Sequence, residues 1–420
     1  MARQESKPMK KHLMVAQSGG PTAAINASLA GVIRGALESG AYDRIYGAVH
    51  GISGVLEENF LELSECAKKE GFLECLSRTP AMYLGSCRMK MPVPADDPAI
   101  YDQIFSTLER MEIAAFFYIG GNDSMDTVAK LSKEAERRGS EIRFAGVPKT
   151  IDNDLIHTDH TPGYGSAAKY IATSMLEIAH DTYIYDLPCV TIVEIMGRDS
   201  GWLTAAAALA RNEYNITPQL LYLPEVPFRK EVFLEDIRRE LARSKNVVVA
   251  VSEGIRDKDG IYISAKEAVA DKFGHMQLSG VGKRLEQLVK KEVGTKVRSI
   301  ELSILQRCAG HVASSCDLEE SCELGAYAVK KTAEGETGFM ASVHRLSDEP
   351  YTYEICCEGL QEIANKAKTV PREWINEAGN DVTEEMLRYI RPLIVGEAGV
   401  GWKDGLPVYL PVAHLNHIGE

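Results

Sequence analysis

The sequence predicts an α/β fold class, with two doubly wound domains and a cleft between them. Three observations support this prediction: the length of the chain, the alternation of apolar runs with helical segments, and the polar clusters that directly follow the apolar runs. The length bears on the number of domains, the alternation on the type of sheet, and the clusters on the position of a functional site.

The chain has 420 residues, of which 45% are hydrophobic and 25% are charged. This composition is ordinary for a globular protein. Because a single hydrophobic core stops growing beyond about 250–300 residues, the length predicts two domains.

Five short apolar runs alternate with segments of helical character. The runs cover residues 12–17, 114–119, 143–148, 190–195 and 246–251. The helical segments after the first two runs end in glycine, at Gly40 and Gly139, as helices commonly do. Apolar strands separated by helices are typical of parallel βαβ units with helices on both faces of the sheet. The pattern therefore predicts two Rossmann-like domains.

A polar cluster follows each of the five runs. The clusters are SGGP (18–21), GGNDS (120–124), KTIDND (149–154), MGR (196–198) and SEG (252–254). In an open α/β sheet, ligands bind outside the carboxyl ends of the strands. Three clusters come from the N-terminal part of the chain and two from its middle. We therefore expect them to converge on one active-site cleft between two domains.

Charge and cysteine content exclude several functions. The net charge of −13 argues against a general binder of nucleic acid or acidic membranes. No stretch approaches the ~20 apolar residues that a membrane span needs. The nine scattered cysteines contain no CxxC pair, so they favour free thiols in a reducing cytosol over a structural zinc site. We expect a cytoplasmic protein.

Two glycine pairs, Gly19-Gly20 and Gly120-Gly121, each follow a predicted strand and precede a predicted helix. Glycine lets the backbone approach a ligand closely, and a helix N-terminus offers unpaired N–H groups, so this context suits phosphate. A single pair is more typical of a tight turn. Two pairs in equivalent positions favour a phosphate site.

Asp152 and Asp154 lie two residues apart in the hexapeptide KTIDND. Paired carboxylates at a strand end suit metal coordination or general-base catalysis. Lys149 precedes Asp152 by three residues and can stabilise negative charge on a leaving phosphoryl group. Asn-Asp turn chemistry is the alternative interpretation, but the compact, polar hexapeptide favours a catalytic role.

Further charged residues lie near the ends of other predicted strands. Arg198 can hold a phosphate through two parallel hydrogen bonds, and Glu253 can bind sugar hydroxyls. Arg88, Arg298 and Arg307 are additional candidate phosphate ligands. Taken singly, each of these residues is also typical of a surface or a salt bridge.

Two other polar features are expected to be structural. His157 and His160 flank a turn, which favours a structural role over a metal pair. The adjacent Cys356 and Cys357 are expected to pack in the interior rather than to carry redox chemistry.

In colinear order, these segments resemble the phosphofructokinase family. The resemblance runs from SGGP near residue 18 to ELGAYAV near residue 329, about three quarters of the chain. PKTIDND and MGR are its most specific motifs, and LGSCR (84–88) and LQR (305–307) fall in the expected order.

The resemblance implies roles for particular residues. Asp152 resembles the general base that takes the proton from the 1-hydroxyl of fructose 6-phosphate. Asn122 stands where most members have an aspartate associated with Mg²⁺, so it is the candidate metal ligand. The residues that resemble substrate ligands are Thr150, Ile151, Asp154, Met196, Gly197, Arg198, Glu253, Arg298 and Arg307. Those that resemble the donor site are Gly19, Gly20, Arg88, Gly121 and Ser124.

The phosphoryl donor is predicted from two positions. Members that use ATP carry glycine where this chain has Asp123 and Lys149. A carboxylate at position 123 would overlap and repel the α-phosphate of ATP, whereas Lys149 can stabilise charge on pyrophosphate. Both residues therefore resemble the pyrophosphate-dependent branch of the family and imply catalytic roles.

The resemblance implies a reversible, Mg²⁺-assisted phosphoryl transfer from pyrophosphate to fructose 6-phosphate, a step of glycolysis or gluconeogenesis, in a homodimer. It assigns the donor to residues 1–163 plus about 306–370, and the sugar phosphate to residues 164–305 plus about 371–420. Two alternatives stay open. One is a kinase that uses ATP or another acceptor, such as sedoheptulose 7-phosphate, and the other is a non-catalytic subunit that binds fructose phosphates.

Overall fold

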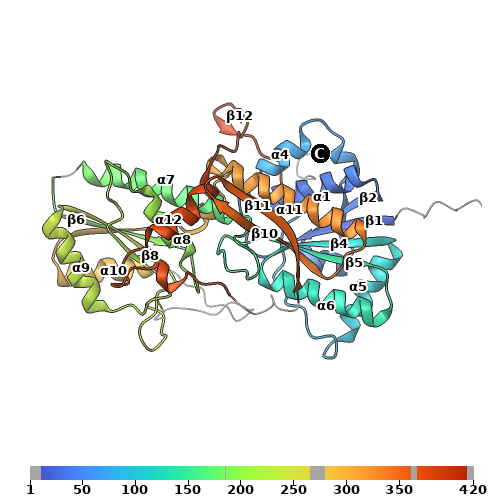
Figure 1. Cartoon of the computed structure of the whole chain (residues 1–420), viewed down its shortest axis with the longest axis horizontal. Coiled ribbons are helices and arrows are strands. Elements are labelled where there is room, and N and C mark those ends of the chain that lie inside the picture. The colour runs from blue at the N-terminus through green and yellow to red at the C-terminus, as the bar shows by residue number, and fades with distance from the viewer. Residues whose placement is uncertain (1–10, 185, 265–279, 361–366, 414–420) are drawn as a thin grey trace, which may run out of the picture.

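Two β-sheets lie side by side along the long axis of the molecule, and helices cover both (Figure 1). The computed structural model describes residues 11–184, 186–264, 280–360 and 367–413. The larger sheet contains β1 (Lys11–Gln17), β2 (Tyr42–Ala48), β3 (Phe60–Glu62), β4 (Ile113–Gly120), β5 (Arg143–Pro148), β10 (Phe339–Asp348) and β11 (Tyr351–Gly359). The smaller sheet contains β6 (Cys189–Ile195), β7 (Leu220–Tyr222), β8 (Asn246–Ser252) and β9 (Lys296–Glu301).

The described α-helices follow the strands along the chain. They are α1 (Ile25–Ser39), α2 (Gly51–Leu56), α3 (Ser64–Ala67), α4 (Phe72–Arg78), α5 (Pro98–Arg110), α6 (Asn122–Arg138), α7 (Tyr164–Tyr183), α8 (Trp202–Ala206), α9 (Lys230–Arg243), α10 (Val281–Glu292), α11 (Ser315–Glu334) and α12 (Glu384–Ile390). A separate small pair of strands is formed by β12 (Trp402–Lys403) and β13 (Leu406–Pro407). None of the helices in the described ranges combines the length and apolar character needed to cross a membrane.

The strand order of the larger sheet is β11-β10-β5-β4-β1-β2-β3. Its five central strands are parallel, and the edge strands β3 and β11 run antiparallel to their neighbours. The smaller sheet has the order β7-β8-β6-β9 and is parallel throughout. The five predicted strands are β1, β4, β5, β6 and β8. The predicted α/β class with parallel sheets is confirmed.

Both faces of the larger sheet are buried, because alternate residues of each strand point to opposite sides. Leu13 and Val15 of β1 pack with α1 and α11, whereas Met14 and Ala16 pack with α5 and α6. This explains why the strand reads as a continuous apolar run rather than as an alternating one. In the smaller sheet, α9 and α10 cover one face, and α7, α8 and α12 cover the other.

The chain passes between the two halves of the molecule more than once. After β9, the helix α11 and the hairpin β10–β11 return to the larger sheet, and residues 370–393 then pack against the smaller one. The N–H of Leu410 donates to Thr79 Oγ1 at 3.0 Å and that of Ala413 to Tyr83 O at 2.8 Å, next to the larger sheet. We propose the division into two domains expected from the sequence, with the segment of Leu410 and Ala413 lying on the first.

Candidate active site

The loops that follow the strands of the larger sheet contact one another at its carboxyl edge. The N–H of Lys149 donates to Gly120 O at 2.9 Å, which joins the loops after β5 and β4. The hydroxyl groups of Ser18 and Ser124 lie 2.9 Å apart, which joins the loops after β1 and β4. Parallel strands bring their carboxyl ends to one edge, so three clusters far apart in the sequence form one surface.

Lys149 lies beneath the first glycine loop. Its side chain is buried, and Nζ donates a hydrogen bond to Gly20 O at 2.7 Å. Gly19 has a φ of +83°, and a Cβ at this position would lie 3.1 Å from Nζ, so the loop can close over the lysine only with glycine here. Burial lowers the pKa of Lys149 to about 8, although Asp152 and Asp154 oppose the shift. The ammonium is thus a desolvated charge next to the first glycine loop.

Asp152 and Asp154 follow in the same loop. The N–H of Asp152 donates to Thr150 Oγ1 at 3.1 Å, a local turn that directs the two carboxylates to the same region. Burial raises the pKa of Asp152, and Lys149 partly opposes the rise. Burial and the neighbouring Asp152 raise the pKa of Asp154 to about 7. Carboxylates with raised pKa are suited to accept a proton near neutral pH.

The smaller sheet contributes the opposite wall. Ser200 Oγ donates to Asp152 O at 3.1 Å, so the loop after β6 contacts the loop that follows β5 of the larger sheet. The N–H of Gly197 donates to Glu253 Oε1 at 3.3 Å, and the N–H of Met196 donates to Gln306 Oε1 at 3.2 Å. Burial raises the pKa of Glu253 to about 7. The predicted MGR and SEG segments therefore lie beside the predicted base.

Arg298 on β9 and Arg307 in the segment after β9 lie in different places. Arg307 ends the short 3₁₀ helix Ser303–Arg307, and its Nη1 would lie 3.6 Å from a Cβ on Gly20. Its Nε is buried and has no hydrogen-bond partner among the described residues. A buried donor without a partner beside a glycine loop suits an anionic ligand, because phosphate oxygens would satisfy it.

Arg298 is not brought to the other candidates in this chain. It lies on β9 opposite Thr191 of β6, and its Nε donates to Thr191 Oγ1 at 3.1 Å. Thr191 precedes the last residue of β6 by four positions, so Arg298 lies about 13 Å from the carboxyl edge at 3.3 Å per residue. Its guanidinium pairs with Asp181 and Thr182 instead.

Arg88 is exposed beside the first glycine loop. Ser86, two residues earlier, donates from Oγ to Gly19 O at 2.8 Å, so the segment LGSCR lies against this loop. The position of the segment fits the predicted role of Arg88 in donor binding.

Asn122 and Asp154 offer a site that fits Mg²⁺. Asn122 Nδ2 donates to Asp154 Oδ2 at 3.2 Å, whereas Asn122 Oδ1 is buried and accepts no hydrogen bond from any residue described in the structure. An unpaired amide oxygen next to a carboxylate is the oxygen-rich environment that a hard cation prefers. Asp123, the next residue, is exposed on the first turn of α6.

Lys368 was missed by the sequence analysis. Its N–H donates to Asp154 O at 2.7 Å, and its Nζ donates to Asp159 O at 2.5 Å and Thr158 O at 3.2 Å. Its carbonyl accepts a hydrogen bond from Trp202 Nε1 at 3.0 Å. Lys368 therefore connects the loop after β5 to Trp202 of α8, which packs on the smaller sheet. It follows no strand and matches no motif, so no local signal identifies it.

A cleft between two α/β domains that combines glycine loops, a buried lysine, an arginine with an unpaired donor and paired carboxylates is that of a phosphotransferase. The model of the family Phosphofructokinase matches residues 12–332 of the chain. A pyrophosphate–fructose 6-phosphate 1-phosphotransferase of Xanthomonas campestris pv. campestris (strain B100) is 40% identical over 407 residues, which cover 96% of each protein. The chain therefore belongs to the phosphofructokinase family.

Two further similarities bear on structure and substrate. The crystal structure of a pyrophosphate-dependent phosphofructokinase from Marinobacter aquaeolei superposes with a TM-score of 0.85 at 36% identity and covers 95% of both chains. A sulfofructose kinase of Alkalicoccus urumqiensis is 31% identical over 365 residues, covering 86% of this chain and 91% of the relative. The family thus includes relatives whose names give different acceptors.

Proposed function

We propose that the protein catalyses the reversible transfer of a phosphoryl group from pyrophosphate to the 1-hydroxyl of fructose 6-phosphate. The products are fructose 1,6-bisphosphate and phosphate. The observation that carries this proposal is the buried ammonium of Lys149, which bonds Gly20 O and lies close enough to Asp152 and Asp154 for their charges to act on its pKa. A fixed positive charge beneath a glycine loop, beside a carboxylate base, suits transfer from a compact anionic donor.

The proposed reaction begins with the sugar phosphate held against the smaller sheet. Asp152 takes the proton from the 1-hydroxyl as its oxygen attacks the nearer phosphorus of pyrophosphate. The bond from that phosphorus to the bridging oxygen breaks, and phosphate leaves. Lys149 stabilises the charge that develops on the donor. Arg307, which the sequence assigned to the sugar phosphate, lies beside Gly20 and is proposed to act on the donor as well. Arg198 and Glu253 hold the sugar phosphate in line with the donor.

Mg²⁺ would be held by Asn122 Oδ1 and the carboxylate of Asp154, and when bound it neutralises charge on the donor oxygens. The remaining catalysis is positioning and charge stabilisation by the residues of the chain itself. Asp123 lies on the first turn of α6, next to this site. Its carboxylate would repel the additional phosphate of a nucleotide, which favours pyrophosphate over ATP.

We further propose a cytoplasmic homodimer. All nine cysteines are free, which supports a reducing compartment. Arg298 lies outside the cleft of its own chain, paired with Thr191 and Asp181. Arg298 can therefore bind the sugar phosphate only in the cleft of a second copy of the chain, which is the reason for proposing a homodimer.

The test is the formation of fructose 1,6-bisphosphate from fructose 6-phosphate and Mg²⁺, with pyrophosphate and ATP run in parallel. We expect activity with pyrophosphate alone, and a loss of about 10³-fold or more in kcat for Asp152→Asn. Asp186→Asn is the control, because Asp186 is an exposed partner of Lys245 and precedes β6, whereas the site loop follows the other end of that strand. Activity with ATP alone would overturn the assignment of the donor, and turnover of sedoheptulose 7-phosphate instead of fructose 6-phosphate would overturn that of the acceptor.

A further inference from the structure

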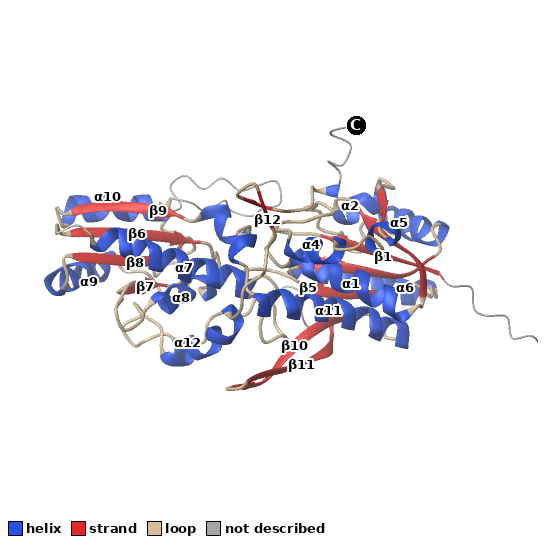
Figure 2. Cartoon of the chain, turned by 90° about the horizontal axis from the view of Figure 1, so that it is seen from above, coloured by secondary structure: helices blue, strands red, loops and turns tan. Residues whose placement is uncertain are grey.

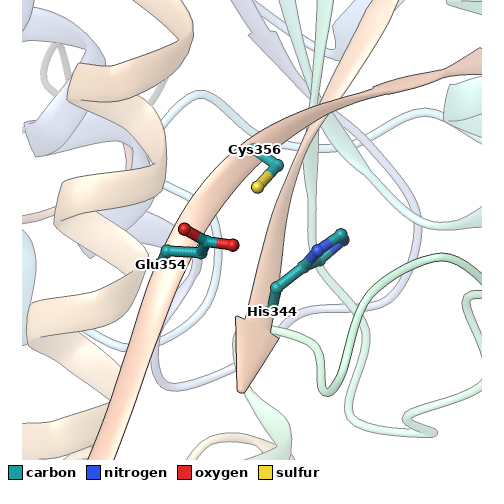
Figure 3. A group of neighbouring side chains, drawn as sticks. All are labelled: His344, Glu354 and Cys356. Atoms are coloured by element: carbon teal, nitrogen blue, oxygen red, sulfur yellow. The ribbon is translucent and has the colours of Figure 1, made fainter. Parts of the chain in front are cut away.

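The hairpin β10–β11 carries a group of potential metal ligands outside the cleft. His344 of β10 pairs with Glu354 of β11 in the strand register, and Cys356 lies two residues further along β11. One ligand atom from each of the three side chains lies within 4.8 Å of the others. Figure 3 shows the three side chains together at the hairpin, with Glu354 and Cys356 on one strand and His344 on the other.

Strand geometry places these side chains on the same face. Residues two apart on a strand point to the same side, and directly paired residues on neighbouring strands do so as well. Cys357 points to the opposite face, where its Sγ lies 3.9 Å from Tyr327 Oη of α11. The adjacent cysteines therefore have different surroundings, and both are only half-buried. Cys357 packs against the core of the larger sheet, as expected, whereas Cys356 does not belong to a core cluster of the described residues, which corrects the expectation for that residue.

We propose that His344, Glu354 and Cys356 form a binding site for a divalent metal ion of the zinc class. Thiolate and imidazole are the ligands that such ions prefer, whereas Mg²⁺ and Ca²⁺ select oxygen ligands. Glu358 lies beside the group and holds the imidazole, because its Oε1 lies 3.0 Å from His344 Nε2. One nitrogen, one sulfur and one carboxylate supply three ligands, and a water molecule would complete tetrahedral zinc.

The distances fit after a small rearrangement. Bonds of 2.0–2.3 Å in a tetrahedral zinc site place the ligand atoms about 3.5 Å apart. The present separations are all within 4.8 Å, so none of them has to close by more than about 1.3 Å. Glu354 is exposed, and His344, Cys356 and Glu358 are half-buried, so their side chains can rotate without repacking a core.

Binding has a defined proton balance. The Cys356 thiol releases its proton to solvent as the sulfur–metal bond forms, and His344 binds as neutral imidazole. Affinity is therefore expected to increase with pH.

The site is separate from the candidate active site in both position and chemistry. The hairpin extends away from the rest of the larger sheet (Figure 2), and none of the three proposed ligands belongs to the cleft described above. A bound ion would join β10 to β11 at the edge of the sheet. We therefore expect it to stabilise the hairpin rather than to take part in phosphoryl transfer.

The test is a titration of the reduced, chelator-treated protein with Co²⁺, which reports thiolate ligation through a charge-transfer absorption band. We expect one equivalent to bind in the wild type, and Zn²⁺ to abolish the band by displacement. Cys356→Ser should abolish the band and His344→Asn should weaken binding at least tenfold. Cys357→Ser is the matched control and should retain both band and stoichiometry, because this thiol faces α11.

Absence of the band in the wild type at millimolar Co²⁺, or its persistence in Cys356→Ser, would overturn the proposal. A second measurement does not depend on spectroscopy: Zn²⁺ should raise the thermal midpoint of the wild type and of Cys357→Ser but not that of Cys356→Ser. Without added Co²⁺ or Zn²⁺, the phosphoryl-transfer activity of Cys356→Ser and His344→Asn, measured with Mg²⁺, should match that of the wild type. This result would show that the variants fold. Because metal binding is measured without turnover, its failure is distinct from a failure of the proposed function.

Discussion

Replacing the buried lysine of the cleft should make the protein more stable while it destroys activity. Lys149 is 2% exposed, and burial lowers its pKa from 10.5 to about 8. At 1.36 kcal/mol per pH unit, keeping this ammonium charged in the folded state costs about 3 kcal/mol below pH 8. Lys149→Met removes this cost but also the hydrogen bond from Nζ to Gly20 O, worth about 1 kcal/mol. The expected net gain is about 2 kcal/mol.

The gain depends on pH in a direction set by the sign of the pKa change. A base whose pKa is lowered by folding destabilises the folded state fully below its folded pKa, and the effect vanishes as the pH rises through its unfolded pKa. The gain in Lys149→Met should therefore be largest below pH 8 and shrink as the pH rises; near and above pH 10.5 the variant should be the less stable protein by about 1 kcal/mol, because only the lost hydrogen bond remains.

The assay is thermal unfolding of both proteins without ligands, together with steady-state kinetics with pyrophosphate. For a domain of this size, about 2 kcal/mol corresponds to a rise in Tm of about 4–8 °C. In the wild type, kcat/KM should fall as the pH rises through about 8, because the neutral amine cannot stabilise the donor. A lower Tm in Lys149→Met would show that the lysine is structural, and unchanged turnover would refute its role in catalysis.

Three other predictions concern donor choice, pH stability and loop positioning. Asp123→Gly should allow ATP to bind by calorimetry; continued exclusion would mean that other walls of the site reject the nucleotide. Burial by itself would lower the pKa of His160, but the carboxylates of Glu320 and Asp159 outweigh it and raise the pKa to about 9. The protonated imidazole should therefore contribute about 3 kcal/mol to the free energy of unfolding below pH 6.5, and this contribution should be lost as the pH rises through 9. His160→Asn should lower Tm at pH 6 and flatten this dependence, and an unchanged Tm profile would contradict the ion pair. Lys368→Met should lower kcat about tenfold and leave KM for the sugar phosphate nearly unchanged, because Lys368 contacts the loop of Asp154. The control is Lys290→Met, at an exposed position of α10, which should leave kcat unchanged. Equal kinetics in the two variants would show that Lys368 is not a positioning residue.

Much of the fold could be predicted because its signals are local. A run such as residues 12–17 is apolar throughout because both faces of β1 are covered, and Leu13 and Met14 pack on opposite sides. Helices α1 and α6 end at Gly40 and Gly139, whose positive φ values favour glycine. Polar clusters after the strands then gather at one edge, since parallel strands end on the same side.

The sequence by itself therefore determined the α/β class and the five main strands, and it predicted that Lys149, Asp152 and Arg307 belong to one site. Only the tertiary structure decided that Arg298 lies in the middle of β9, away from the cleft, because strand register is set by the neighbouring strand and not by spacing along the chain. Only the tertiary structure also shows that Lys368 forms hydrogen bonds with the segment after β5, and that His344 lies within 4.8 Å of Cys356. Both depend on contacts between segments that are distant in the sequence. Local patterns specify where strands and turns occur, whereas register and long-range packing specify which side chains meet.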